Sequence, residues 1–249
     1  MDEETLQYHL KHVHKQTALS ENLKELVYGG IDGIITTFAV VAGFTGATMM
    51  ATSQNENGMV ISVSVVLIFG LANLFADGFS MGVGDFLSSR AEKKLFDKEL
   101  RKEVSAIKGD EKFEYDETIF ILMENGFTKD DAHTITNIYK KNPKFWAEFM
   151  MRYELNMTHP DNSPVRSAVI TFIAFIVFGA IPLLPYIFEI SSFDGQFMMA
   201  AIFAALALVL LGFIRAKFTK ESIITSMSEI VGLGMAAAFI AYFVGTLFA

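Results

Sequence analysis

Three acidic residues lie inside two long apolar stretches of the sequence. Asp32 stands in LVYGGIDGIITTF, and Asp77 and Asp85 stand with Met81 in ADGFSMGVGDF. Ionisable side chains are costly at membrane depth and usually mark a path for an ion, a proton or a substrate. Positions 77, 81 and 85 follow one another at four-residue spacing, so in a helix they lie along one stripe. This stripe, facing Asp32, is a candidate cation path.

The donor types in this stripe favour a transition metal. Carboxylates supply negative charge, and a thioether sulfur favours a first-row transition metal over Mg²⁺ or Ca²⁺, which prefer oxygen ligands. Asn73 lies one turn before Asp77 and adds a neutral ligand. Met81 taken alone is better explained by packing, and an interfacial position is the alternative for Asp85. Asp32 and Asp77 together require a cation, a proton or water at membrane depth.

A second set of candidate ligands lies in the polar segment 91–164. Glu114 and Glu117 stand three residues apart, and Glu103 lies among the acidic residues that precede them. In FMMRYE, two adjacent methionines precede Glu154 by one helical turn and share a face with it. Glutamates on a solvated helix usually face water, and adjacent methionines usually belong to a core. Their conjunction indicates a metal-binding segment.

The acidic stripe and Asp32 lie in apolar stretches that are long enough to span a membrane, and these stretches must position them. The chain has 249 residues, 52% of them hydrophobic, and its mean hydropathy is +0.38. About 20 apolar residues cross a bilayer as a helix, so we expect an all-α polytopic membrane protein with five spans. Glu229 lies early in the fifth, where an interfacial role and a proton-relay role explain it equally well. The stretches are 26–50, 59–87, 165–188, 197–214 and 223–248.

The distribution of basic residues predicts the orientation of the spans. Of 20 Lys and Arg residues, fourteen lie between 90 and 166 and three between 215 and 220, whereas the connections 51–58 and 189–196 contain none. Cytoplasmic loops carry the excess of Lys and Arg. The N-terminus, the segment 91–164 and the connection 215–220 are therefore expected in the cytoplasm, and the C-terminus outside.

The chain is expected to have four parts. The first is an amphipathic helix on the inner membrane surface, in which His9, His12 and His14 are better explained as solvated side chains than as metal ligands. The parts are 1–25, the interfacial helix; 26–90, spans one and two; 91–164, a cytoplasmic helical metal-binding domain; and 165–249, spans three to five.

The second span is expected to continue beyond the membrane. No proline interrupts 59–107, and one helix over this range is on the order of 70 Å long, against about 30 Å of hydrocarbon. Shorter helices should follow it. Gly126 is a candidate helix stop, Thr128 begins a pattern that resembles a capping box, and Asn142 with Pro143 indicates a helix start.

The remaining composition excludes or lowers several functions. Cysteine is absent and the formal charge is −8, which excludes disulfides and thiolate sites and argues against nucleic-acid binding. A membrane-anchored carboxylate ferroxidase is disfavoured because no glutamate is followed by histidine three residues later, the pair that helical di-iron sites usually use. A membrane-anchored metal sensor would not need Asp32, Asp77 and Asp85 at membrane depth. Both remain alternatives to transport.

Three separated motifs resemble the vacuolar iron transporter family. They are the stretch from Gly29 to Ala47, DGFSMGVGDFLSSRAE at 77–92, and KNPKFWAEFMMRYEL at 141–155. The resemblance covers nearly the whole chain and implies a homodimer of five-span protomers with a cytoplasmic metal-binding domain. It also implies export of Fe²⁺, and in some members Mn²⁺, from the cytosol in exchange for protons.

The resemblance also implies roles for individual residues. Asp32 matches the first-span metal-translocating aspartate, Met81 the second-span methionine ligand, and Glu21 a glutamate near the cytoplasmic entrance. Ala106 stands where eukaryotic members have another glutamate. Asn73 stands where some members have a membrane glutamate, while two additional carboxylates lie on the same helix. The implied cytoplasmic metal ligands are Glu103, Glu114, Glu117, Met150, Met151 and Glu154.

The sequence therefore predicts a proton-coupled exporter of Fe²⁺, Mn²⁺ or both. No tightly bound cofactor is expected, because the metal ions are cargo; Zn²⁺ and Co²⁺ are further candidates for the cytoplasmic domain. The expected partners are these ions, protons, the lipid bilayer and a second copy of the chain. Short terminal segments favour a prokaryotic cell membrane over a vacuole.

Overall fold

The structure is a computed structural model that describes residues 2, 5, 8, 21–54, 63–160, 163–189 and 193–247. Every secondary-structure element assigned within these residues is helical. This confirms the all-α expectation. The interfacial helix expected over 1–25 lies largely outside the described residues, as do His9, His12 and His14.

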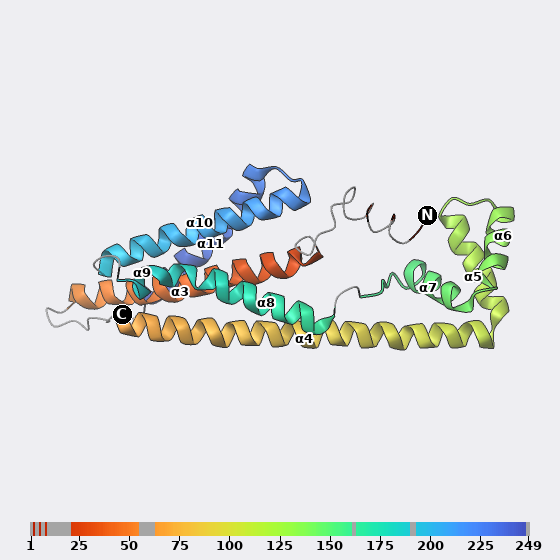
Figure 1. The fold of residues 1–249 in the computed structure, drawn as a ribbon, viewed down its shortest axis with the longest axis horizontal. Coiled ribbons are helices and arrows are strands. Elements are labelled where there is room, and N and C mark those ends of the chain that lie inside the picture. Colours follow the sequence, from red (N-terminus) through yellow and green to blue (C-terminus); the bar gives the residue numbers. More distant parts are fainter. Residues whose placement is uncertain are drawn as a thin grey trace. The chain divides into compact units, whose positions relative to one another are not determined.

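Five of the described helical segments are long and apolar enough to cross a membrane, which confirms the predicted number of spans (Figure 1). The third is assembled from several short elements, and each of the others is a single helix. The spans are Leu23–Ala47 in α3 (Leu23–Gln54), Val63–Gly109, which is α4, Pro164–Ile187, Gly195–Thr219 in α10 (Phe193–Thr219), and Ile223–Val244 in α11 (Ile223–Leu247).

The third span changes geometry near its end. Helix α8 (Pro164–Gly179) is followed by the 3-10 turn η1 (Ile181–Leu183) and the short helix α9 (Leu184–Ile187). Pro182 has no backbone N–H to continue the α-helical ladder. The N–H of Leu183 instead donates to the carbonyl of Ala180, three residues back, at 3.0 Å.

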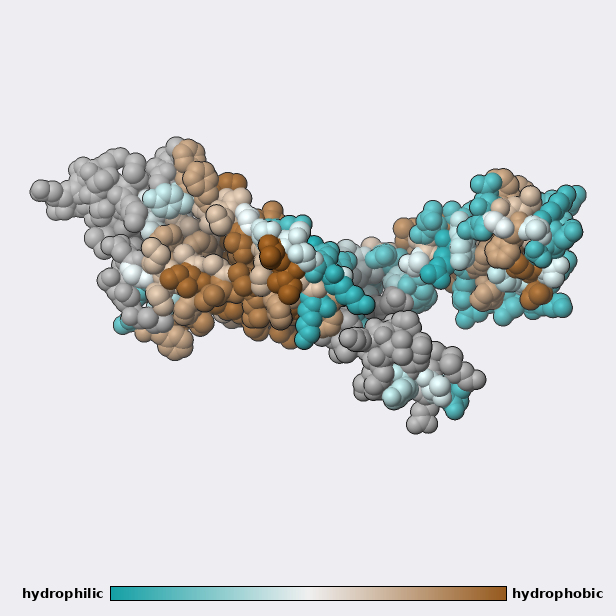
Figure 2. All heavy atoms as spheres, turned by 90° about the horizontal axis from the view of Figure 1, so that it is seen from above, coloured by the Kyte–Doolittle hydropathy of each residue, from teal (hydrophilic) through white to brown (hydrophobic). Residues whose placement is uncertain are grey.

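The chain divides into two compact units. The membrane unit comprises Met1–Phe86 and Val165–Ala249, and the inserted unit comprises Leu87–Pro164. The boundary falls inside α4, a helix of 47 residues, on the order of 70 Å long. About 20 residues cross the hydrocarbon, so the part of α4 in the inserted unit lies beyond its membrane-spanning part. Hydrophobic side chains cover much of the membrane unit in Figure 2, whereas hydrophilic side chains dominate the inserted unit.

Helix α3 is central to the packing of the membrane unit. It packs against α10 and α11, and it approaches α8 so closely that only glycine fits at the contact. A Cβ atom on Gly33 would lie 2.4 Å from the carbonyl oxygen of Phe175, and one on Gly29 would lie 2.6 Å from that of Thr171. This approach places the polar residues at the start of α3 beside those of α8.

The inserted unit adds three helices to the end of α4, and local capping sets their limits. The Thr128 hydroxyl accepts from the Asp131 N–H at 3.2 Å, and Asn142 Oδ1 accepts from the Phe145 N–H at 3.3 Å. Gly126 adopts φ +95°, which favours glycine. The expected helix punctuation is therefore confirmed. The helices are α5 (Glu111–Glu124), α6 (Lys129–Tyr139) and α7 (Pro143–Tyr153).

Trp146, the only tryptophan of the chain, is at the centre of the inserted unit and is 0% exposed. It packs in one cluster with Ile107 of α4, Leu122 of α5 and Met150 of α7. This core fixes the three helices against the end of α4.

Candidate functional site

The membrane unit brings two acidic residues from different spans together. Asp32 on α3 and Asp77 on α4 are half-buried, and their carboxylates are close enough for their charges to interact. Asn73 Nδ2 donates to Asp77 Oδ2 at 2.7 Å. Because its amide nitrogen holds Asp77, the amide oxygen of Asn73 is the atom that remains suited to a cation.

Met81 lies on the same helix one turn after Asp77. It is half-buried and packs against the cluster that contains Leu74 and Phe175. Packing therefore explains part of its environment, as expected for Met81 taken alone. Its role as a sulfur ligand stays a prediction.

Asp85 belongs to a different group of side chains, contributed by α3, α4 and α8. Asp85 Oδ2 lies 2.6 Å from the Ser167 hydroxyl and 3.2 Å from the Thr171 hydroxyl. The Ser167 hydroxyl also lies 3.1 Å from Glu25 Oε1. Glu25, Ser167 and Thr171 are buried. We call these four residues the Ser167 cluster.

Three members of the Ser167 cluster were not predicted from the sequence. Glu25 stands one turn after Glu21, and Ser167 and Thr171 stand one turn apart, so each pair shares a helix face. That spacing was the available signal. Glu21, the predicted entrance residue, is half-exposed and forms an ion pair with Arg166 Nη2 at 3.2 Å.

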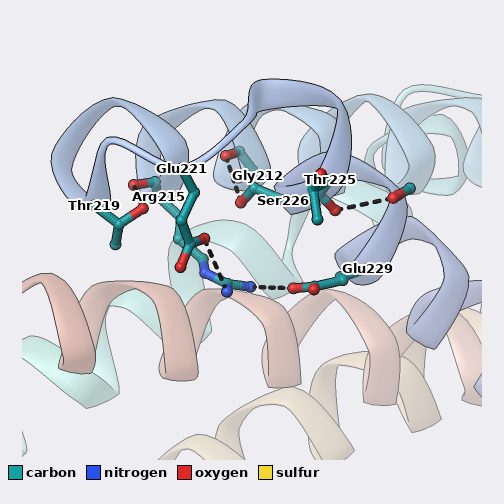
Figure 3. Close-up of polar contacts among 8 residues, drawn as sticks. Gly212, Arg215, Thr219, Glu221, Thr225, Ser226 and Glu229 are labelled. Carbon is teal, nitrogen blue, oxygen red and sulfur yellow. Dashed lines mark hydrogen bonds and ion pairs between the residues drawn. The ribbon is translucent and has the colours of Figure 1, made fainter.

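Glu229 is held by an ion pair at the connection between α10 and α11 (Figure 3). Arg215 Nη1 donates to Glu229 Oε2 at 3.0 Å, and Arg215 Nη2 lies 3.1 Å from Glu221 Oε2. This geometry accords with the interfacial alternative for Glu229, and the proton-relay role stays a prediction.

Four predicted glutamate ligands gather in the inserted unit. Glu103 and Glu114 are 8% and 7% exposed, and their carboxyl groups are hydrogen-bonded to each other. Burial, followed by the charges of Glu114, Glu154 and Glu117, raises the pKa of Glu103 to about 8. Burial also raises the pKa of Glu114 and of Glu154. One oxygen each of Glu103 and Glu114 is buried without a hydrogen-bond partner.

The two predicted methionine ligands, Met150 and Met151, are fully buried in the same unit. Met150 Sδ lies 3.2 Å from the Thr118 hydroxyl, which donates to the carbonyl of Glu114 at 2.7 Å. The same hydroxyl accepts from Trp146 Nε1 at 2.7 Å. Thr118 therefore links the methionine of α7 to the helix that carries Glu114. Met151, like Met150, is 0% exposed.

These side chains are neighbours rather than a closed ligand shell. Among the residues that the structure describes, no group of three or more His, Asp or Glu side chains is spaced to hold one metal ion. Buried carboxylates repel one another in a low-dielectric site. These side chains thus have the donor types that a divalent cation uses, and their role as metal ligands stays a prediction.

Comparisons with known proteins identify the family. The VIT family model matches residues 23–246. A vacuolar iron transporter of Toxoplasma gondii is 34% identical over 246 residues, covering 95% of this chain and 77% of the relative. A vacuolar iron transporter of Plasmodium falciparum is 32% identical, covering 94% and 85%. Vacuolar iron transporter 1 of Arabidopsis thaliana is 29% identical, covering 93% and 88%. The match spans both units, and the chain belongs to the VIT family.

Proposed function

We propose that this protein transports Fe²⁺, Mn²⁺ or both out of the cytosol in exchange for protons. The observation that carries the proposal is the pair formed by Asp32 and Asp77 on two membrane-spanning helices. Two carboxylates at membrane depth are stabilised by a cation or a proton. The names of the relatives, which are iron transporters, support iron as cargo.

In this mechanism the inserted unit captures the metal on the cytoplasmic side. Its carboxylates provide charge and its thioether sulfurs favour transition metals over Mg²⁺. Metal and proton compete for the same oxygen atoms, so binding releases protons. Zn²⁺ and Co²⁺ fit the same donors. The proposed ligands are Glu103, Glu114, Glu117, Met150, Met151 and Glu154.

The ion then passes Glu21 and reaches the pair Asp32 and Asp77, with Asn73 and Met81 as further ligands. Protons from the far side compete for the two carboxylates and release the metal. A carboxylate cannot hold a metal ion and a proton tightly at the same time. This competition couples the two fluxes without any covalent step.

We further propose that the transporter is a homodimer in a prokaryotic cell membrane. The excess of Lys and Arg in the inserted unit and its absence from the connections 51–58 and 189–196 support a cytoplasmic position for the inserted unit and the N-terminus. Oligomers of identical chains are mostly closed and symmetric, with C2 dimers the commonest form. A dimer would bring two copies of the acidic stripe on α4 into one assembly.

Flux into sealed proteoliposomes tests the proposal. Reduced Fe²⁺ and Mn²⁺ are offered separately to the full-length protein, with and without a pH gradient. We expect gradient-stimulated flux, and we expect Asp32→Asn to reduce it by on the order of 10- to 100-fold because a neutral amide replaces a charged ligand. The comparison between the two ions names the preferred cargo.

Asp116→Asn is the matched control, because Asp116 is an exposed acidic residue on α5. It should transport like the unmodified protein. Gradient-independent flux would contradict proton coupling. Metal binding without flux of either ion would contradict transport and favour the metal sensor.

A further inference from the structure

We infer that the Ser167 cluster, Glu25, Asp85, Ser167 and Thr171, is a separate divalent-cation site of the membrane unit. It shares no residue with the pair Asp32 and Asp77 or with the inserted unit. Its place in transport rests on the proposed function, whereas its ability to bind a cation does not.

The hydroxyl of Ser167 has too few hydrogen atoms for its two carboxylate contacts. Ser167 Oγ lies 2.6 Å from Asp85 Oδ2 and 3.1 Å from Glu25 Oε1, yet a serine hydroxyl carries one hydrogen. It can donate to one carboxylate only. The other contact then joins two oxygen atoms through their lone pairs, unless a positive particle lies between them. A cation satisfies both contacts together.

The second carboxylate oxygen of Glu25 also lacks a partner that a cation would supply. Glu25 is 7% exposed, and its Oε2 atom is buried without a hydrogen-bond partner. Leaving such a group unpaired costs a large desolvation penalty. A proton on Oε1 would satisfy the contact with Ser167 and still leave Oε2 unpaired. A divalent cation can engage both oxygens, because carboxylates bind in a bidentate manner.

The nearby basic residue is already engaged. Arg166 precedes Ser167 on α8, and its guanidinium pairs with Glu21 at 3.2 Å. Lys24, beside Glu25 in sequence, is exposed on α3. The guanidinium of Arg166 therefore compensates the charge of Glu21, one turn before Glu25, rather than that of Glu25 itself.

The donors define the class of ion. Two carboxylates and two hydroxyls make a site of oxygen atoms only, which suits hard and borderline divalent cations such as Mn²⁺ and Fe²⁺. Soft ions gain nothing here, because the cluster has no sulfur. We therefore expect this site to be less selective than one that includes a methionine.

The position of the cluster gives it a role. Glu25 precedes Asp32 by seven residues on α3, and Asp85 follows Asp77 by eight on α4. At 1.5 Å per residue both separations are about 10 to 12 Å. The two antiparallel helices thus carry two pairs of carboxylates in succession. The cluster, nearer the Glu21 end, is a loading site from which an ion moves on to Asp32 and Asp77.

Binding of Mn²⁺ to the full-length protein in detergent tests the site without requiring transport. Bound and free Mn²⁺ are distinguished by electron paramagnetic resonance. We expect Glu25→Gln to bind one Mn²⁺ fewer per chain than the unmodified protein at the same free Mn²⁺ concentration. Glu92→Gln, which removes an exposed charge from α4, should bind the same number. An equal number for Glu25→Gln would overturn the inference.

Ser167→Ala provides a second variant that keeps both carboxylates. It should weaken Mn²⁺ binding at this site by about tenfold, and it decides the matter if Glu25→Gln fails to elute as a folded species. The alternative to a cation in the Ser167 cluster is a proton shared between its carboxylates and the Ser167 hydroxyl. It predicts an unchanged Mn²⁺ count in both variants with an altered pH dependence of flux, and that result overturns the cation site. Glu25-dependent binding in a protein without flux would support the site and refute only the proposed transport.

Discussion

Glu103 and Glu114 form a pair of buried carboxyl groups among the proposed metal ligands of the inserted unit. Both are buried, they share a hydrogen bond, and burial raises the pKa of Glu103 to about 8. Near neutral pH, Glu103 therefore keeps its proton and donates it to Glu114. An arriving cation must displace this proton, so metal affinity should increase with pH.

The same pair makes the stability of the inserted unit depend on pH. The pKa of Glu103 is about 8 in the folded protein, against 4.5 for a glutamate exposed to water in the unfolded chain, so the folded state binds more protons. Its contribution to stability is fully present below pH 4.5 and is lost as the pH rises to about 8. We expect metal-free protein to lose protection from amide hydrogen exchange in 111–153 over this range.

Glu103→Gln should remove most of that dependence and stabilise the unit at pH 8, by on the order of 5 °C in its unfolding midpoint. A neutral amide cannot acquire the charge that Glu114 and Glu154 repel. Glu92→Gln is the control with an exposed side chain. A pH dependence that Glu103→Gln leaves intact would show that another group carries it.

At the level of elements, the close contact between α3 and α8 positions the polar groups of the membrane unit. Helix propensity and hydropathy predict each span separately, because both are local properties. The contact of Glu25 with Ser167 joins residues 142 positions apart, and it depends on how two helices pack. The sequence therefore predicted Asp32, Asp77 and the helix caps at Thr128 and Asn142, but not the Ser167 cluster.

Gly33→Ala tests this contact. The new methyl group would meet the carbonyl oxygen of Phe175 at 2.4 Å, so the helices must separate. We expect the protein to be destabilised in detergent by on the order of 1 to 3 kcal/mol, measured as a lower melting temperature, and we expect reduced flux.

Gly84→Ala is the matched control on α4, where no atom lies within 4 Å of the added Cβ. It should be neutral or slightly stabilising, since alanine favours a helix over glycine by about 1 kcal/mol. Equal effects of the two substitutions would show that helix propensity, not packing, governs both positions.

At the level of the whole molecule, the proposed membrane orientation rests on the distribution of charge rather than on the fold. The five spans are compatible with either orientation in the membrane. The proposed orientation depends on the Lys and Arg residues, which are enriched in cytoplasmic loops. The absence of cysteine makes this prediction easy to examine, because an introduced thiol is the only one present.

Two single-cysteine variants test the orientation, Ser222→Cys and Glu189→Cys. Ser222 lies between α10 and α11, and Glu189 follows α9. A membrane-impermeant maleimide should label Glu189→Cys in intact cells and Ser222→Cys only after the cytoplasmic face is opened. Both residues lie outside the helices that span the membrane, so neither substitution should affect folding. The opposite labelling pattern would invert the proposed direction of transport.

Trp146 provides a way to observe the inserted unit by fluorescence. Trp146 donates to Thr118, whose hydroxyl also touches Met150 Sδ. Trp146 is the only tryptophan of this 249-residue chain. All tryptophan fluorescence therefore comes from a residue that is linked through Thr118 to Met150, a proposed metal ligand. The emission of Trp146 is an intrinsic optical probe of the inserted unit, and in purified protein reconstituted into lipid it reports on this unit without any attached dye.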